Sequence, residues 1–157
     1  MRERREQWGI ALNLDTLGSV ARRQGQYHLA RSLHEEGIAA SQAIGDKWAI
    51  ALSHANIGHV ARALGDDPDA HAHYAESLRI YREVGDRRGI ALTLGNLGVL
   101  AERAGEHDRA RDYLQESLST ARAVGDQRVA AAALNQLAGL ALGRGDLPAA
   151  AIGYAES

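Results

Sequence analysis

The chain has 157 residues, of which 45% are hydrophobic but only 4% aromatic, so its core must rely on Ala, Leu, Ile and Val, a composition that favours packed helices over a β-sandwich. Its formal charge of −2 offers no general attraction to nucleic acid or an acidic membrane surface, and the lack of cysteine excludes a disulfide framework or a thiolate zinc site. No apolar run reaches the roughly 18 residues of a membrane span, and the start of the chain lacks the apolar core of a signal peptide, so we expect a cytoplasmic protein without membrane or nucleic-acid contacts.

An internal repeat with a period of 40 residues organises the chain. The strings GDKWAIAL, GDRRGIAL and GDQRVAAA begin at Gly45, Gly85 and Gly125. The pattern predicts one domain over 1–157, with repeats at 6–45, 46–85 and 86–125 and a partial repeat at 126–157. Several columns match without a gap: alanine at 11, 51, 91 and 131, at 21, 61, 101 and 141, and at 30, 70, 110 and 150; glycine at 25, 65, 105 and 145; and Leu17, Ile57, Leu97 and Leu137.

Each repeat is predicted to be a pair of helices. In the second repeat, Asp67 and Pro68 indicate the start of a helix, as a capping residue followed by a proline in the first turn. In the third, apolar residues step by three and four positions along 90–101 and again along 110–124, and a glycine ends each of these helices. Because a single hairpin cannot bury both of its faces, the hairpins must stack into an all-α solenoid.

The segment TLGNLGVLAERAG at 93–105 contains enough glycine to suggest a phosphate-binding loop. A Walker loop needs glycine directly before lysine, but the only lysine, Lys47, follows Asp46. A dinucleotide loop needs a preceding strand, whereas the helical pattern runs straight through Gly95 and Gly98. Gly95 is therefore expected to keep a groove-facing position open. A close approach of the paired second helix is predicted at the column Gly18, Gly58, Gly98 and Ala138.

Other catalytic and metal-binding patterns are incomplete, and we expect no enzyme activity, no cofactor and no metal site. HEEGI at 34–38 begins like a zinc-protease helix but has Ile38 in place of the second histidine. No serine lies in a nucleophile elbow. The histidines at 54, 59, 71 and 73 are not spaced to share one helical face. An inter-repeat polar contact or a solvated face is indicated by the recurring Glu36, Glu76, Glu116 and Glu156.

One polar column lies beside the packed stripe of the first helix in each repeat. It consists of Thr16, Asn56, Asn96 and Gln136. These side chains are expected to project toward the concave side of the solenoid, where they could hydrogen-bond along an extended peptide backbone. The alternative is that they only cap local polar groups or bind water.

The pattern NLG…A…G…A…Y.ES resembles the tetratricopeptide repeat over residues 6–157, lengthened from the usual 34 residues to 40. It is similar to the repeats of Pins-type spindle-orientation scaffolds and to arrays in bacterial signalling ATPases and transcriptional regulators. The resemblance implies a right-handed superhelix with a peptide-binding groove. In those scaffolds the polar column holds asparagines that contact peptides, a role that transfers most directly to Asn56 and Asn96. The family's first-helix tryptophan is replaced by Leu14, His54, Leu94 and Leu134, and its second-helix aromatic survives only as Tyr74 and Tyr154.

The remaining groove positions predict a mildly basic surface that suits a peptide with acidic residues, although such arginines can also be plain solubilising charge. The family's chaperone-binding branch uses a lysine and an asparagine, and this chain has Asp15 and Ser19 in those columns, which argues against a C-terminal carboxylate ligand. The predicted groove also includes Arg22, Arg23, His59, Arg62, Val99, Glu102, Arg103 and Asn135.

We therefore expect a module that binds a peptide or protein partner in its concave groove. The alternative is a regulatory or oligomerising segment of a larger signalling ATPase or transcriptional regulator. The chain stops at Ser157 within a second helix, and residues 1–5 match the tail of a preceding one. Both ends thus suggest a piece of a longer array, or self-association through uncapped ends.

Overall fold

A computed structural model describes residues 2–143, 145 and 147–156, and every secondary-structure element in that part of the chain is a helix. Met1 and Ser157, the outer limits of the predicted domain, lie outside the described residues. Short turns separate consecutive helices. The helices are α1 (Arg2–Arg23), α2 (Tyr27–Ile44), α3 (Lys47–Ala63), α4 (Asp67–Val84), α5 (Arg87–Arg103), α6 (His107–Ala123), α7 (Gln127–Gly143) and α8 (Leu147–Glu156).

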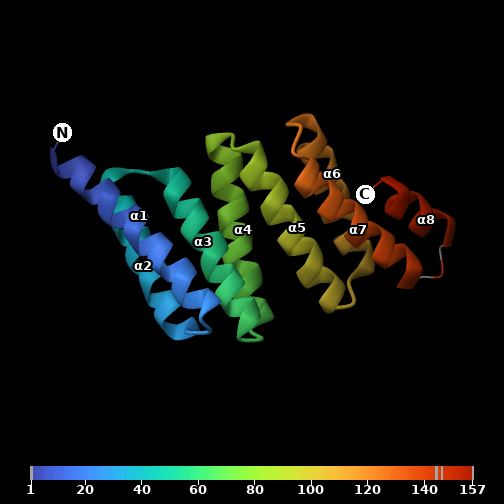
Figure 1. Ribbon diagram of the computed structural model, residues 1–157, viewed down its shortest axis with the longest axis horizontal. Helices are drawn as coiled ribbons and strands as arrows, with labels where there is room; N and C mark the ends of the chain where they lie inside the picture. The colour runs from blue at the N-terminus through green and yellow to red at the C-terminus, as the bar shows by residue number, and fades with distance from the viewer. Residues whose placement is uncertain (1, 144, 146, 157) are drawn as a thin grey trace. The chain divides into compact units, whose positions relative to one another are not determined.

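The helices pair as hairpins, α1 with α2, α3 with α4, α5 with α6 and α7 with α8 (Figure 1). The chain divides into two compact units, Met1–Gly85 and Asp86–Ser157. Within the first unit α3 packs on both α1 and α2, and within the second α7 packs on both α5 and α6. Within each unit, both helices of the first hairpin thus pack on the first helix of the second hairpin. This arrangement confirms the predicted all-α solenoid of helical hairpins.

The repeated Gly-Asp dipeptide ends one helix and begins the next. Gly45 adopts the left-handed conformation, with φ at 72°, at the end of α2, where a side chain would be strained. The following residue, Asp46, accepts a hydrogen bond from the backbone N–H of Ala49 and so caps α3. Asp86 and Asp126 cap α5 and α7 in the same way.

The start of α4 differs by one residue from the sequence-based prediction. Asp66, not Asp67, is the capping residue, and its carboxylate accepts the backbone N–H of Asp69 at 3.1 Å. Asp67 is the first helical residue, so Pro68 occupies the second helical position. Proline fits there because the N–H groups of a first turn have no intrahelical partner.

Glycines inside the first helices let the second helices approach closely, as predicted. A Cβ added to Gly58 would lie 2.6 Å from the ring of Tyr74, and one added to Gly98 would lie 2.7 Å from Leu114. At Gly18 the neighbour is the ring of His34, also at 2.7 Å. Each glycine therefore makes room for one large buried side chain from the paired helix.

The fourth hairpin makes this contact differently. Ala138 takes the glycine position, and its methyl group faces Gly153 on α8, where an added Cβ would lie 2.9 Å from it. Tyr154 is 50% exposed, whereas Tyr74, its counterpart in the second repeat, is fully buried. The alanine methyl occupies the space that a ring would need, so the small residue has moved from the first helix to the second.

Alanine columns form the centre of each hairpin. Ala30, Ala70 and Ala110 are fully buried, and the side chain of Ala150 lies outside those described. Two apolar positions of the predicted stripes are exposed instead. Leu17 is 55% exposed, and Val124, which follows the last residue of α6, is 41% exposed. None of the described helices is both long and apolar enough to cross a membrane.

Candidate binding surface

A hollow of about 280 Å³ lies between α5 and α7 in the second unit. Its lining includes Gly95 and Asn96 from α5 and Gln136 from α7. Neither carboxamide has a hydrogen-bond partner among the described residues. Two positions of the predicted polar column therefore line one cavity with their hydrogen-bonding capacity free.

The opposite end of this hollow is basic. Arg88 and Arg128 lie in the first turns of α5 and α7, and both contribute to the lining. The Nε of Arg88 donates to Asp126 at 2.9 Å, which fixes this guanidinium at the rim. The hydrogen bond from the backbone N–H of Val129 and the ion pair with Arg88 lower the pKa of Asp126. Two other lining residues are bonded to each other: the hydroxyl of Ser117 donates to the backbone carbonyl of Ala91 at 2.7 Å.

The first unit has a smaller hollow, of about 60 Å³, at the same repeat positions. Trp8 and Trp48 occupy the places of Arg88 and Arg128. Leu12 corresponds to Leu92, Asp46 to Asp126 and Leu52 to Ala132. The two hollows are therefore two versions of one site, built from different side chains.

In the first unit the polar column is used internally. Asn56 donates its amide to Oδ1 of Asp15 at 2.9 Å, and the same oxygen lies 2.9 Å from Nδ1 of the buried His34. The hydroxyl of Thr16 donates to the backbone carbonyl of Leu12 at 2.8 Å. These two side chains thus make the local hydrogen bonds of the alternative interpretation, whereas Asn96 and Gln136 make no such bond to a described residue.

Two of the predicted basic residues of the first unit, Arg22 and Arg62, lie near His59. The ring nitrogen Nδ1 of His59 lies 2.8 Å from the hydroxyl of Tyr74. Burial, together with the nearby charges of Arg62 and Arg22, lowers the pKa of His59 to about 4. The Nε of Arg22 is buried and has no hydrogen-bond partner among the described groups.

The other predicted groove residues line neither hollow. Partly buried positions are Ser19, Val99 and Glu102, whereas Arg23, Arg103 and Asn135 are exposed. Their exposure is compatible with partner contact but gives them no shared cavity.

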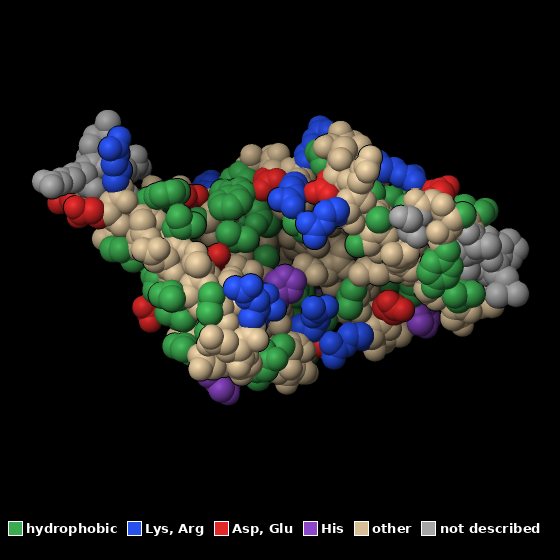
Figure 2. Space-filling view, in the orientation of Figure 1, with side chains coloured by type: hydrophobic (Ala, Val, Ile, Leu, Met, Phe, Trp, Pro, Cys, Tyr) green, Lys and Arg blue, Asp and Glu red, His purple; other side chains and the backbone are tan. Residues whose placement is uncertain are grey.

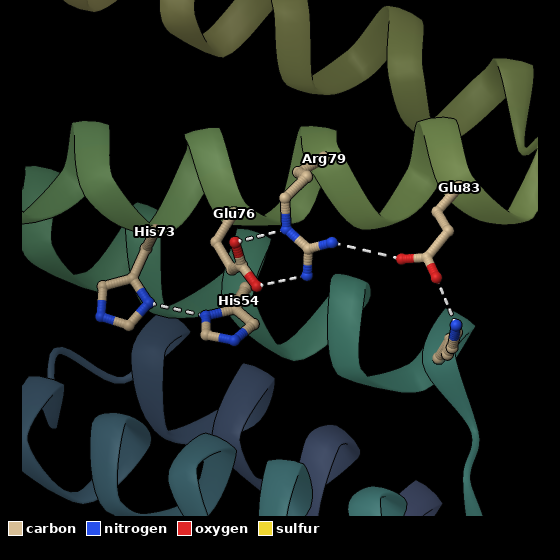
Figure 3. Close-up of polar contacts among 6 residues, drawn as sticks. His54, His73, Glu76, Arg79 and Glu83 are labelled. Atoms are coloured by element: carbon tan, nitrogen blue, oxygen red, sulfur yellow. Dashed lines mark hydrogen bonds and ion pairs between the residues drawn. The ribbon is translucent and has the colours of Figure 1, made fainter.

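A histidine pair joins α3 to α4, and the other repeats have leucine in the column of His54. The Nδ1 atoms of His54 and His73 lie 2.9 Å apart, so one ring donates and the other accepts (Figure 3). Burial lowers the pKa of both rings. Alongside, Arg79 bridges Glu76 and Glu83, and Glu83 also pairs with Lys47. Among the described residues, no three His, Cys, Asp or Glu side chains are grouped so as to hold a metal ion.

Charged side chains of both signs are interspersed on the face drawn in Figure 2. Hydrophobic side chains gather there over the region of α1 to α4. Exposed apolar residues of this first unit include Trp8, Leu12 and Trp48. The residues that sequence reasoning missed are the two tryptophans. Their signal was their column, because both lie three positions before the alanines at 11 and 51 and recur one repeat apart.

Comparisons with known proteins agree with this architecture. The model of the family described as Tetratricopeptide repeat matches residues 9–83 and 89–157. Among solved structures, BtubC (BKLC) from P. vanneervenii is similar, with a TM-score of 0.80 and 18% sequence identity, over 91% of this chain and 59% of that one. The chain thus spans about three fifths of that neighbour's length, and the likeness shows the fold alone. No curated protein matches the sequence.

Proposed function

Since the chain belongs to the tetratricopeptide repeat family, whose repeats generally mediate protein–protein interaction, we propose that it binds an extended segment of a protein partner between α5 and α7. The observation that carries this proposal is the hollow of about 280 Å³ into which Asn96 and Gln136 bring unpaired carboxamides. A carboxamide offers both a donor and an acceptor, which matches the alternating N–H and C=O groups of an extended peptide.

The length of the hollow along α5 matches a short stretch of extended peptide. Arg88 and Asn96 are eight residues apart on α5, a distance of about 12 Å at the helical rise of 1.5 Å per residue. An extended chain advances about 3.3 Å per residue, so about four residues would span this distance. Gly95 supports the same interpretation, because the absence of its side chain deepens the hollow beside Asn96.

The charge of the hollow favours an acidic side chain in that segment. Arg88 and Arg128 meet only one acidic residue of the lining, Asp126. Arg128 has no ion-pair partner among the described side chains. A guanidinium in this position can hold a carboxylate through two parallel hydrogen bonds. We therefore expect partner segments with Asp or Glu at one end of the contact.

A displayed library of random linear peptides tests the proposal. Peptides selected on the wild type should be enriched in acidic residues, and fluorescence anisotropy should show them bind the double variant Asn96→Ala/Gln136→Ala about tenfold or more weakly. Two lost hydrogen bonds of about 1 kcal/mol each give this magnitude.

The matched control is Gln115→Ala, which truncates an exposed carboxamide on α6 outside the hollow. It should bind the peptides as the wild type does, and thermal unfolding followed by circular dichroism should show all three proteins folded. Undiminished binding to the double variant would contradict the proposal, and so would a library that yields no binder.

The alternative function is regulatory packing or self-association, and one observation favours it. The last hairpin exposes Leu142, Ile152 and Tyr154, three large apolar side chains on α7 and α8. Exposed apolar surface of this kind is typical of contacts with another domain or another copy. This surface lies outside the hollow of the second unit, so the two functions are compatible within one chain.

A further inference from the structure

The hollow of the first unit is walled by two indole rings. Trp8 on α1 and Trp48 on α3 occupy the same position of consecutive repeats, and 54% and 48% of their surfaces are exposed. They are the only tryptophans of the chain. Leu12 and Leu52 complete the apolar wall. Exposed aromatic rings of this size are expensive to leave in water unless a partner covers them.

The polar groups of this hollow are acidic. Asp15 and Asp46 are its only charged residues, so no lysine or arginine of the lining neutralises them. Oδ1 of Asp15 accepts a hydrogen bond from Asn56 and lies within hydrogen-bond distance of His34. Oδ1 of Asp46 accepts the backbone N–H of Ala49. Among the described residues, Oδ2 of each carboxylate has no further hydrogen bond. The two Oδ2 atoms can therefore still accept hydrogen bonds from a cationic donor.

A buried hydroxyl is also unpaired in the same hollow. Ser41 is 1% exposed, lines the cavity, and its Oγ has no hydrogen-bond partner among the described groups. A buried hydroxyl without a partner costs free energy. The second unit has Ala121 at this position, which is fully buried and needs no partner. The serine thus provides an additional polar group in this hollow that the second unit lacks.

The exchange of residues between the two hollows reverses their charge. Arg88 and Arg128 give the second hollow two guanidinium groups, whereas Trp8 and Trp48 give the first hollow two indole rings at the same positions. An indole face attracts cations and leaves the carboxylate charge uncompensated. The first hollow therefore rejects the acidic side chain that the second one favours.

We propose that the hollow between Trp8 and Trp48 binds the guanidinium of an arginine side chain carried by a protein partner. A guanidinium is planar, stacks on indole rings and donates in a fork to carboxylate oxygens, which are the groups present here. The volume of about 60 Å³ equals about two water molecules at their liquid volume of about 30 Å³ each. It thus admits the tip of one side chain. The proposal rests on the proposed function only in that the ligand belongs to a protein.

Fluorescein-labelled peptides of alanine around a single arginine, citrulline or lysine test this proposal with the full chain. Citrulline keeps the shape of arginine but lacks its charge. The arginine peptide should bind saturably by anisotropy and shift the tryptophan fluorescence, which reports on this hollow alone. The citrulline peptide should bind about tenfold more weakly, since charged hydrogen bonds are the stronger ones. Equal binding of the citrulline peptide would overturn the proposal, and equal binding of the lysine peptide would overturn the assignment to a guanidinium.

Two variants separate binding from folding. Trp8→Arg/Trp48→Arg copies the residues that the second unit carries at these positions, so the helices should be retained while arginine binding falls by about tenfold or more. Ser41→Ala introduces the residue that the second unit carries at the corresponding position, Ala121. It should raise the melting temperature and weaken binding of the arginine peptide several-fold. Retained affinity in the tryptophan variant would overturn the proposal, as would a Ser41→Ala protein with unchanged affinity.

The matched control is Gln115→Ala, which lies outside both hollows and should leave the arginine peptide's affinity unchanged. The experiments distinguish a failure of the proposed arginine site from a failure of the proposed peptide site between α5 and α7. Loss of library peptides from Asn96→Ala/Gln136→Ala, without any effect of arginine peptides on tryptophan fluorescence, rejects only the arginine site. The reverse result rejects the carboxamide site and supports the first hollow as a binding surface.

Discussion

Glycine has three different roles in this chain, which are distinguished by what a side chain would meet. Gly45 has a positive φ at a helix end. Gly58 and Gly98 have helical backbone but lie against a buried side chain of the paired helix. Gly95 lines a cavity, and its nearest obstacle is the hydroxyl of Ser117 at 3.6 Å, an ordinary contact distance. Substitutions at these positions should therefore have different effects.

Gly58→Ala should destabilise the protein. The new methyl would lie 2.6 Å from the fully buried ring of Tyr74, which has no space to move aside. Overpacking costs about 1–3 kcal/mol, and the gain in helix propensity of about 1 kcal/mol offsets part of it. Urea unfolding should show a net loss of up to about 2 kcal/mol. The control Gly139→Ala, with nothing within 4 Å of the new Cβ, should be neutral or slightly more stable. Equal stability of the two variants would refute the packing role.

Gly95→Ala should separate binding from stability. The added methyl meets only Ser117, so the free energy of unfolding should be unchanged or about 1 kcal/mol higher. The same methyl reduces the hollow beside Asn96, so peptides selected on the wild type should bind several-fold more weakly in the anisotropy assay. If affinity were unchanged, the hollow would not be where the peptides bind.

At the scale of elements, the α3–α4 hairpin carries partly buried histidines. His54 and His73 replace Leu14 and Leu33 of the first repeat, and Nδ1 of His59 lies within hydrogen-bond distance of the Tyr74 hydroxyl. Burial lowers the pKa of all three rings from the ordinary value of 6.5. The folded hairpin thus requires neutral imidazoles, and its stability must depend on pH.

Stability should fall as the pH is lowered from 7 to 5. The pKa of His59 is 6.5 in the unfolded chain, its ordinary value, and about 4 in the folded chain. Between these two pH values the unfolded chain therefore binds a proton more strongly than the folded chain does. The contribution of a neutral His59 is therefore fully present above pH 6.5 and is lost progressively toward pH 4. For this residue alone the loss between pH 7 and 5 is about 2 kcal/mol. Urea unfolding at several pH values measures it.

His59→Gln should reduce this pH slope, because glutamine does not titrate and can still meet the Tyr74 hydroxyl. The control His28→Gln removes an exposed histidine on α2 and should leave the slope as in the wild type. A His59→Gln protein with the full pH slope would exclude His59 as its source.

At the scale of the whole molecule, the chain carries two compact units, each with a hollow at the same repeat positions. One hollow is lined by arginines and carboxamides, and the other by tryptophans and carboxylates. The last hairpin adds exposed Leu142, Ile152 and Tyr154. Three surfaces of different chemistry are thus available for partners.

Self-association through the last hairpin predicts a concentration-dependent mass. Light scattering coupled to size-exclusion chromatography should show the average mass of the wild type rise with concentration, with a dissociation constant in roughly the millimolar to micromolar range. Ile152→Ser, which removes the most exposed of these side chains, should weaken the rise. Leu64→Ser, which removes an exposed leucine of the first unit, should not. A constant monomer mass of the wild type would contradict self-association.

The sequence predicted the features that depend on neighbours within one hairpin. The Gly-Asp period located the helix ends because a left-handed glycine and an aspartate cap act over a few residues. The column of Gly18, Gly58 and Gly98 predicted close packing because glycine inside a helix is costly unless something approaches it. The one-residue error at the start of α4, where Asp67 was predicted to cap the helix and Asp66 does, is also local. Two adjacent aspartates can each provide the capping carboxylate.

What the amino-acid order left open is which polar groups remain unpaired. The column of Thr16, Asn56, Asn96 and Gln136 looked uniform, yet Asn56 donates to Asp15 while Asn96 and Gln136 line a hollow. That outcome depends on contacts between helices of different repeats, which no local periodicity encodes. The two tryptophans became a pair in the same way, once α1 and α3 were packed together. Local sterics therefore determined the hairpins, and only tertiary packing decided where their surface can bind.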